Sequence, residues 1–446
     1  MKMPLFDTLR LKFEQPNWAS NPEFGLFDTI LEQYPELIAL AEADVTRGCK
    51  TSEFGRKDMP SVEQIVRAAI YKEFKGLDYR ELEYAQDDSR ICQQFVKLDN
   101  RVPFCFQVFQ KYISKITVDT LQQIMMALNK IAINDGLESI EKIRQDSTVV
   151  ETNIHYPTNN SLVWDCMKES QRLLAHLAAE VKDLNYIDYT TGAKKTFFKI
   201  NNTKSSDKRT DLFNKQLIVF TKCINQVANV VKKKQAYSTR AMLLLMELEN
   251  FISTMQQVYS MAWRREINKE AVPNDEKIFS IYEKHTDIIV KGGREVQFGH
   301  KINLATGKSN LILHCEILKG NPADSTLYRH TLDKVISDYG IIPRDCATDG
   351  GYASIANATH AKSKGIVNIV FNKIVGSLKN IVSSKNIETR LKKWRSGIEA
   401  NISNLKRGFH IFRCNWKGEP HFGQKVMWSV IAYNIRVMTA AVIANI

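Results

Sequence analysis

One stretch of the chain, residues 394–408, reads WRSGIEANISNLKRG and has the pattern of an amphipathic helix. Spacings of four and seven residues return to one helix face, so Arg395, Glu399 and Lys406 lie nearly on one line. A neighbouring apolar stripe would seat the helix on a core. This stripe consists of Ile398, Ile402 and Leu405. A solvated helix with ordinary ion pairs has the same pattern, so the stretch gains meaning only from residues elsewhere.

Length and composition indicate a globular protein with two or three domains. The chain has 446 residues, of which 44% are hydrophobic and 25% are charged. This balance does not indicate a large disordered region. The formal net charge is +13 and the isoelectric point is about 9.2. A basic protein of this kind favours a polyanionic partner, either nucleic acid or an anionic membrane surface.

Cysteine usage and the two chain ends favour a cytoplasmic protein without a membrane segment. The eight cysteines include no C-x-x-C pair, which argues against a zinc site and against a disulfide scaffold. The first residues, MKMPLFDTLRLKFEQ, lack the apolar core of a signal peptide. The most apolar segment, residues 426–446, is interrupted by Asn434 and Arg436. We therefore expect a packed C-terminal helix there, because a membrane span tolerates such residues poorly.

The N-terminal part, residues 1–135, is predicted to be helical. An amphipathic run covers Leu26–Ala43, and a longer helix is expected over Phe106–Asn134. Ser61 and Asp78 are candidate N-caps of two further helices. Short helices rich in Lys and Arg suit a helix-turn-helix-like DNA-binding unit, and they suit a plain helical bundle equally well.

The helical spacing of apolar residues ends before residues 142–152, KIRQDSTVVET. This short segment is rich in β-branched residues and is predicted to form a strand. Alternation places Asp146, Thr148 and Val150 on one face and Glu151 on the other. A carboxylate among Ile and Val on a central strand is unfavourable unless a cation compensates it. Asp146 is therefore a candidate site residue, and Glu151 is a weaker one.

Residues 158–286 carry no strand signal and are predicted to form an all-helical insertion. Helices are expected over Leu162–Leu184, Asp211–Lys234 and Thr239–Lys269. A basic, polar patch lies between the first two, from Lys194 to Arg209. The insertion is compatible with a dimerisation arm, and its basic clusters are also compatible with contacts to phosphates.

Strands resume after the insertion. Residues 295–304 and 311–318 are predicted to form a hairpin around Ala305-Thr306-Gly307-Lys308-Ser309. This turn resembles the end of a P-loop, but it lacks the first glycine and precedes a strand, so we reject that reading. A helix over 325–339 precedes a short strand that ends in Asp349-Gly350-Gly351. Glycines there permit a tight turn and the close approach of a ligand, although Asp-Gly-Gly is also a common turn.

Taken together, these motifs resemble the DDE transposases of bacterial and archaeal insertion sequences. The resemblance covers nearly the whole chain. It rests on four segments: Gly55–Leu98, Asp146–Pro157, Ala347–Ser354 and Ile398–Gly408. The family's Tyr-x2-Arg-x3-Glu-x6-Lys signature is matched at Arg395, Glu399 and Lys406, with Lys392 in place of the tyrosine.

The resemblance implies an α/β fold with an RNase H-like mixed sheet, a large helical insertion and an N-terminal helical domain. In such a sheet the strands of Asp146 and Asp349 lie side by side, and the last helix brings Glu399 over them. The implied boundaries are 1–135 for the N-terminal domain, 136–157 with 287–424 for the catalytic core, 158–286 for the insertion and 425–446 for the C-terminal helix.

The same resemblance implies a chemistry. Asp146, Asp349 and Glu399 would be the catalytic residues and would hold two Mg²⁺ or Mn²⁺ ions for DNA cleavage and strand transfer. Arg395, Lys406 and Arg407 would contact the DNA backbone, although ion pairs with Glu399 are an open alternative for the first two. The partners would be the element's terminal repeats and target DNA, bound by a homodimer. Alternatives are an inactive DNA-binding relic and an RNase H-like nuclease.

Overall fold

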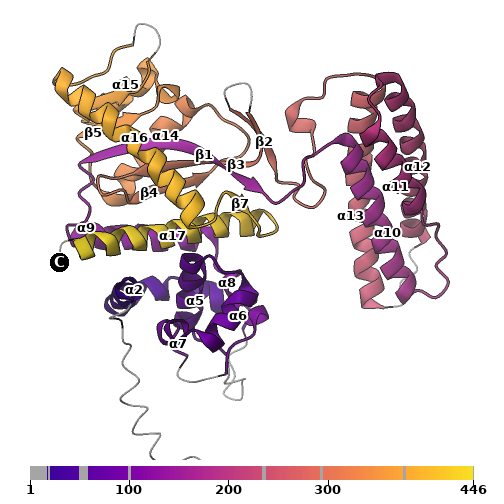
Figure 1. Cartoon of the computed structure of the whole chain (residues 1–446), viewed down its shortest axis with the longest axis horizontal. Coiled ribbons are helices and arrows are strands. Elements are labelled where there is room, and N and C mark those ends of the chain that lie inside the picture. The colour runs from indigo at the N-terminus through magenta and orange to yellow at the C-terminus, as the bar shows by residue number, and fades with distance from the viewer. Residues whose placement is uncertain are drawn as a thin grey trace, which may run out of the picture. The chain divides into compact units, whose positions relative to one another are not determined.

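The computed structural model describes Trp18 and residues 21–49, 59–98, 102–233, 238–291, 295–374 and 378–444. The chain divides into two compact units, one from Met1–Thr152 with Ile289–Ile446 and the other from Asn153–Ile288. The first combines a mixed sheet with helices, whereas the second is largely helical (Figure 1). The chain is therefore a mixed α/β protein, as the sequence predicts.

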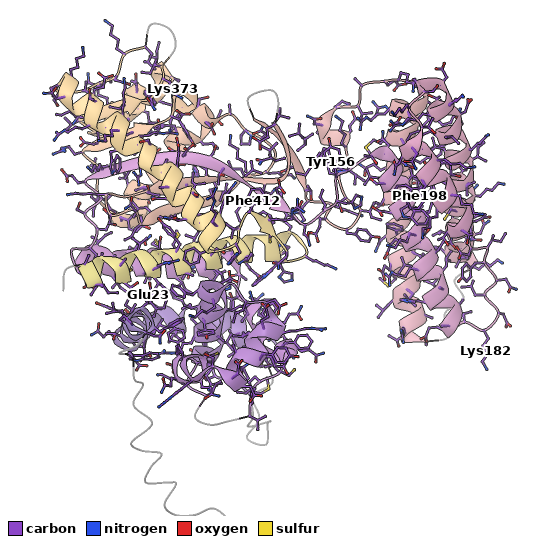
Figure 2. All side chains as sticks on the ribbon, viewed as in Figure 1. Glu23, Tyr156, Lys182, Phe198, Lys373 and Phe412 are labelled. Carbon is purple, nitrogen blue, oxygen red and sulfur yellow. The ribbon has the colours of Figure 1, made fainter. Side chains whose placement is uncertain are left out.

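In its described residues, the second unit consists mainly of long helices around a core of its own. They are α10 (Asn159–Glu180), α11 (Thr190–Asn202), α12 (Ser206–Lys233) and α13 (Thr239–Ala262), which continues as a π-helical turn η2 (Trp263–Ile267). Lys182 and Phe198 lie at the surface of this unit (Figure 2). The sequence did not predict α11. Only Ala193 and Ile200 are fully buried on α11, so its apolar periodicity is too sparse to recognise.

The first unit begins with short helices. They are α2 (Pro22–Gln33), α3 (Glu36–Ala39), α4 (Glu42–Thr46), α5 (Val62–Lys75), α6 (Tyr79–Asp88), α7 (Arg90–Phe95), α8 (Phe106–Ile113) and α9 (Val118–Asn134). The prediction of one amphipathic run over Leu26–Ala43 is wrong, because the helix ends before Pro35. A proline disfavours helical geometry in the residue before it, and Tyr34 has φ −126° and ψ 65°.

The predicted helix Phe106–Asn134 is also divided in two. Thr117 is extended, and its hydroxyl accepts a hydrogen bond from the backbone N–H of Thr120, which caps α9. The caps predicted at Ser61 and Asp78 are confirmed, and each is part of a capping box. The motif Gly55-Arg56-Lys57 lies outside the described residues.

The sheet has β1 at its centre. The strands are β1 (Lys142–Thr152), β2 (Asp287–Lys291), β3 (Glu295–Thr306), β4 (Ile312–Ile317), β5 (Asp345–Thr348), β6 (Asn368–Phe371) and β7 (Arg413–Cys414). The main order is β2-β3-β1-β5-β6. β1 runs antiparallel to β3 and parallel to β5, and β5 runs parallel to β6. The expected neighbourhood of the Asp146 and Asp349 strands is therefore confirmed.

The hairpin of β3 and β4 is confirmed, and its turn binds an internal carboxylate. Glu138 is buried, and its side chain accepts hydrogen bonds from the backbone N–H groups of Lys308 and Ser309 at 3.1 and 2.9 Å. The hydroxyl of Ser309 donates to the same carboxylate at 2.5 Å. The turn that resembles the end of a P-loop is thus an anion site, and the chain's own Glu138 fills it.

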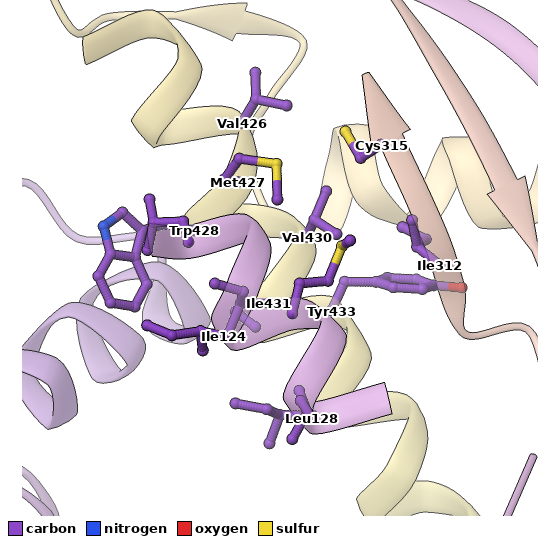
Figure 3. Close-up of a cluster of buried hydrophobic side chains, with 14 of the residues drawn as sticks. Ile124, Leu128, Ile312, Cys315, Val426, Met427, Trp428, Val430, Ile431 and Tyr433 are labelled. Carbon is purple, nitrogen blue, oxygen red and sulfur yellow. The ribbon is translucent and has the colours of Figure 1, made fainter. Parts of the chain in front are cut away.

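Among the described residues after β4, the α-helices are α14 (Asp324–Tyr339), α15 (Ile355–Ser363), α16 (Lys385–Gly408) and α17 (Glu419–Ala444). By length and composition α17 could cross a membrane, but 67% of its most apolar window is buried. Its side chains meet those of α9 and β4 in the core (Figure 3). Asn434 is satisfied there, because its side chain bonds Asn129 and the backbone of Ile312. The segment predicted as a packed C-terminal helix lies in α17, which begins at Glu419, before the predicted start.

Candidate active site

Asp146 occupies the middle of β1, opposite Leu304 of β3. Its side chain is 18% exposed, and its Oδ1 accepts a hydrogen bond from the backbone N–H of Ser147 at 2.8 Å. Burial raises the pKa of Asp146 to about 6, although the charge of Arg395 and the Ser147 hydrogen bond act to lower it. The nearby positive charge therefore lowers the pKa of Asp146 by less than burial raises it.

Asp349 directly follows β5. Gln145 pairs with Thr348 in the parallel register, so Asp146 and Asp349 are the next residues along two adjacent strands. A Cβ at Gly350 would lie only 2.6 Å from the backbone oxygen of Asn372. The sequence predicts either a tight turn or the close approach of a ligand at this glycine. In the structure it makes room for the protein's own backbone, and this packing fixes the turn that carries Asp349.

Glu399 lies on α16, and the guanidinium of Arg395 joins it to both aspartates. Nη2 of Arg395 is 2.7 Å from Oδ2 of Asp146 and 3.8 Å from Oδ1 of Asp349. Nη1 of the same arginine is 3.2 Å from Oε1 of Glu399. The structure therefore brings together the three acidic residues predicted from the sequence, which come from three separate segments of the chain.

Arg395 itself is 7% exposed and faces the carboxylates. The open alternative, in which Arg395 is an ion-pair partner of Glu399, describes this state of the protein. A contact of Arg395 with DNA phosphate stays a prediction.

Lys406 and Arg407 lie in the last turn of α16, away from the acidic residues. Seven or eight residues along a helix span about 10–12 Å, so neither joins Glu399 and the aspartates. Nζ of Lys406 lies 5.4 Å from the ring centre of Phe412, and Arg407 is exposed. Glu151, the weaker candidate, pairs with Arg413 at 2.8 Å and is not part of the acidic group.

Arg144 holds α16 against the sheet, a role that the sequence reasoning missed. Its guanidinium donates to the backbone oxygen of Trp394 at 2.6 Å and lies 4.7 Å from the centre of the Trp394 ring. A Cβ at Gly397 would be 2.5 Å from Nη1 of Arg144, so the glycine permits this approach. Because alternate strand residues share a face, the position two residues before Asp146 was a usable signal.

Asp324, the first residue of α14, is a further carboxylate near Asp146 that the sequence did not indicate. Its Oδ1 accepts a hydrogen bond from the hydroxyl of Ser147 at 2.9 Å and lies 2.6 Å from Nζ of Lys301. Its negative charge is one cause of the raised pKa of Asp146. No spacing in the sequence connects residue 324 to residue 146, so only the fold reveals this neighbour.

The donor chemistry at this site fits a hard divalent cation. Asp146, Asp349 and Glu399 offer carboxylate oxygens, which Mg²⁺ and Mn²⁺ prefer. Within the described ranges, no three His, Cys, Asp or Glu side chains stand in a metal-binding arrangement. At the acidic group a protein cation, Arg395, lies between the three carboxylates. One positive charge faces three negative ones, so the group can accept further positive charge.

Comparison with known proteins adds one finding. Residues 269–435 match the family model described as transposase DDE domain. Over these residues the chain is similar to the transposase DDE domain. The matched range contains Asp349, Arg395 and Glu399, whereas Asp146 precedes the helical unit and lies outside it. No curated protein and no solved structure matches the chain.

For a DDE transposase, this arrangement has a direct chemical meaning. The transposase family implies a DNA substrate. A cluster of carboxylates around a partly open site is suited to placing cations beside a scissile phosphate. The helix α16 contributes both the last carboxylate and the internal cation.

Proposed function

We propose that the protein cleaves the ends of an insertion sequence and joins them to target DNA, with Asp146, Asp349 and Glu399 as catalytic residues. The observation that carries the proposal is the convergence of these three carboxylates on the single guanidinium of Arg395. These carboxylates come from three separate segments of the chain, and a single cation faces all three. The family match supports the same chemistry.

Asp146, Asp349 and Glu399 would hold two Mg²⁺ or Mn²⁺ ions, which would supply charge stabilisation for in-line displacement at phosphorus. Arg395 performs a related task without metal, because it offsets the mutual repulsion of the three carboxylates. Arg144 and Trp394 keep α16 in place, so Glu399 stays over the sheet. Lys406 and Arg407 would bind backbone phosphates beyond the site.

We also propose the finer fold assignment that goes with this chemistry. The central β1, its antiparallel neighbour β3 and its parallel neighbour β5 support an RNase H-like core over 136–157 and 287–424. Residues 158–286 would be an insertion, 1–135 a DNA-binding domain and 425–446 a helix that completes the core. A homodimer in the cytoplasm would hold two element ends at once.

Cleavage of the element's own ends tests the proposal. Labelled DNA with these ends is incubated with wild-type protein and with Asp349→Ala, in Mg²⁺ or in EDTA. We expect cuts at the ends only for the wild type with Mg²⁺. Binding to the ends without cutting by the wild type would indicate the DNA-binding relic, and cutting without regard to the ends would indicate a general nuclease. Folded protein that neither binds nor cuts would contradict the proposal.

A further inference from the structure

The helical unit concentrates positive charge on two of its helices. Residues 190–233, which contain α11 and α12, include ten Lys and Arg residues and two acidic residues, Asp207 and Asp211. All ten basic side chains are exposed. We call these exposed Lys and Arg residues of 194–233 the α11–α12 basic surface.

These cations differ in their partners from three arginines of the same unit. Among the described residues, none of the ten has a carboxylate oxygen within the 4.0 Å that defines an ion pair. By contrast, Arg172 is 2.6 Å from Glu169, Arg240 is 3.4 Å from Glu180, and Arg264 is 2.5 Å from Glu276. Unpaired like charges repel one another, so a run of ten exposed cations with only two acidic residues favours the binding of an anionic partner.

The geometry of α12 orders part of this surface. Lys208, Lys215 and Lys222 are seven residues apart, so they follow one side of the helix at intervals of about 10 Å. Lys222 then borders an open groove of about 450 Å³ that continues along the same helix. The groove is lined from α12 by Asn225, Asn229 and Lys233 as well, and Asp183 lines it from the segment after α10. Amide and ammonium groups in a row are donors suited to phosphate oxygens.

We propose that the α11–α12 basic surface binds the phosphate backbone of duplex DNA without regard to sequence. Charge complementarity selects this partner, since duplex DNA carries one negative charge per about 1.7 Å of its axis. The inference rests on DNA as the substrate of the proposed function, and it adds a second contact surface outside the acidic site. This surface would hold flanking or target DNA during the reaction.

A matched pair of charge variants tests the proposal in the full-length chain. Lys208→Gln, Lys215→Gln and Lys222→Gln are combined in one protein. The control combines Arg172→Gln, Arg240→Gln and Arg264→Gln, which removes the same charge from ion-paired positions of the same unit. Circular dichroism establishes that both are folded. Binding to a duplex of arbitrary sequence is followed by fluorescence anisotropy in EDTA across a range of NaCl concentrations.

We expect the lysine variant to bind at least about tenfold more weakly and its salt slope to fall by about three, one for each phosphate contact. The control should keep the wild-type slope. Equal losses in both variants, or a loss in neither, would overturn the proposal. It would also be overturned if the lysine variant lost binding to RNA or to anionic vesicles and kept duplex binding. Because EDTA prevents metal-dependent cleavage, a catalytically inactive chain with the expected binding would refute only the proposed function.

Discussion

Arg67 and Arg395 are two buried arginines, each in contact with three carboxylates, and their surroundings differ in charge balance. All three nitrogen positions of the Arg67 guanidinium are used: Nη1 lies 2.6 Å from Asp28, Nη2 2.7 Å from Glu32 and Nε 2.8 Å from Glu63. A second cation, Lys97, also contacts Glu32 and Glu63. This cluster joins α2 to α5, and its two cations balance most of the charge of its three carboxylates.

The guanidinium of Arg395 has fewer hydrogen bonds than that of Arg67, and its cluster has fewer cations. Nε of Arg395 has no hydrogen-bond partner among the described residues, and Asp349 is 3.8 Å away. In the described part of the chain no second Lys or Arg contacts these three carboxylates. Asp349 and Glu399 remain 45% and 68% exposed. The two clusters therefore differ in degree: two cations face three carboxylates around Arg67, whereas one cation faces three carboxylates around Arg395, which leaves the larger deficit for an incoming cation to fill.

The largest expected difference between the two clusters is in activity. Glu399→Gln should lower the cleavage rate at least about a thousandfold, or about 4 kcal/mol of activation free energy. Because Glu399 is mostly exposed, the free energy of unfolding should change by less than about 1 kcal/mol. Glu63→Gln should show the reverse pattern, with near-normal cleavage and reduced stability. Single-turnover cleavage and urea denaturation measure both, and similar profiles for the two variants would break the comparison.

Substitution of the arginine should change the free energy of unfolding by different amounts in the two clusters. Arg67→Met should lower the free energy of unfolding by about 2–4 kcal/mol, because it removes a fully buried guanidinium that joins three carboxylates, two of which would keep only Lys97. Arg395→Met should lower it less, since two of its carboxylates reach solvent. Mn²⁺ should also raise the melting temperature of Arg395→Met by more than it raises that of the wild type, because the ion replaces the missing positive charge. A larger Mn²⁺ effect on Arg67→Met would contradict the assignment of the open site.

Much of this site could be predicted from the sequence, because Asp146, Asp349 and Glu399 each stand in a locally recognisable element. A β-branched run, a strand before a glycine pair and an amphipathic helix all have short-range signals. The roles of Asp324 and Arg144 had weak signals or none, since they depend on long-range packing. The helix breaks at Pro35 and Thr117 had local sequence signals, a proline and an N-cap threonine. The prediction followed the hydrophobic periodicity instead. The helix α11 was missed because most of its residues are polar and exposed.

A smaller effect is expected from the packing that positions α16. Gly397→Ala places a methyl group where Nη1 of Arg144 lies, so Arg144 must shift and α16 must follow. We expect about a tenfold loss in cleavage rate, since small displacements of a catalytic group are costly. The matched control is Gly192→Ala on α11, where no atom lies within 4 Å of the added Cβ. The control should cleave normally, and an equal loss in both variants would exclude a positioning role.

The smallest expected effect is a pH dependence of stability at the Arg67 cluster. Burial would raise the pKa of Glu63, but Lys97 and Arg67 outweigh it, and the pKa lies below the ordinary value of 4.5. Glu63 therefore contributes stability that is present above pH 4.5 and is lost as the pH falls through the lowered pKa. Urea midpoints should decline less steeply below this pH in Glu63→Gln than in the wild type. Parallel curves would show that the cluster does not depend on the ionised carboxylate.

The most direct test compares two acidic residues on the same strand. Asp146 belongs to the Arg395 cluster, whereas Glu151 pairs with Arg413 outside it. Single-turnover cleavage of labelled element ends in Mg²⁺ is measured for Asp146→Asn and Glu151→Gln. The charge-deficit site predicts no detectable cleavage by Asp146→Asn and a rate close to wild type for Glu151→Gln. Wild-type cleavage by Asp146→Asn would contradict the catalytic role of the three carboxylates.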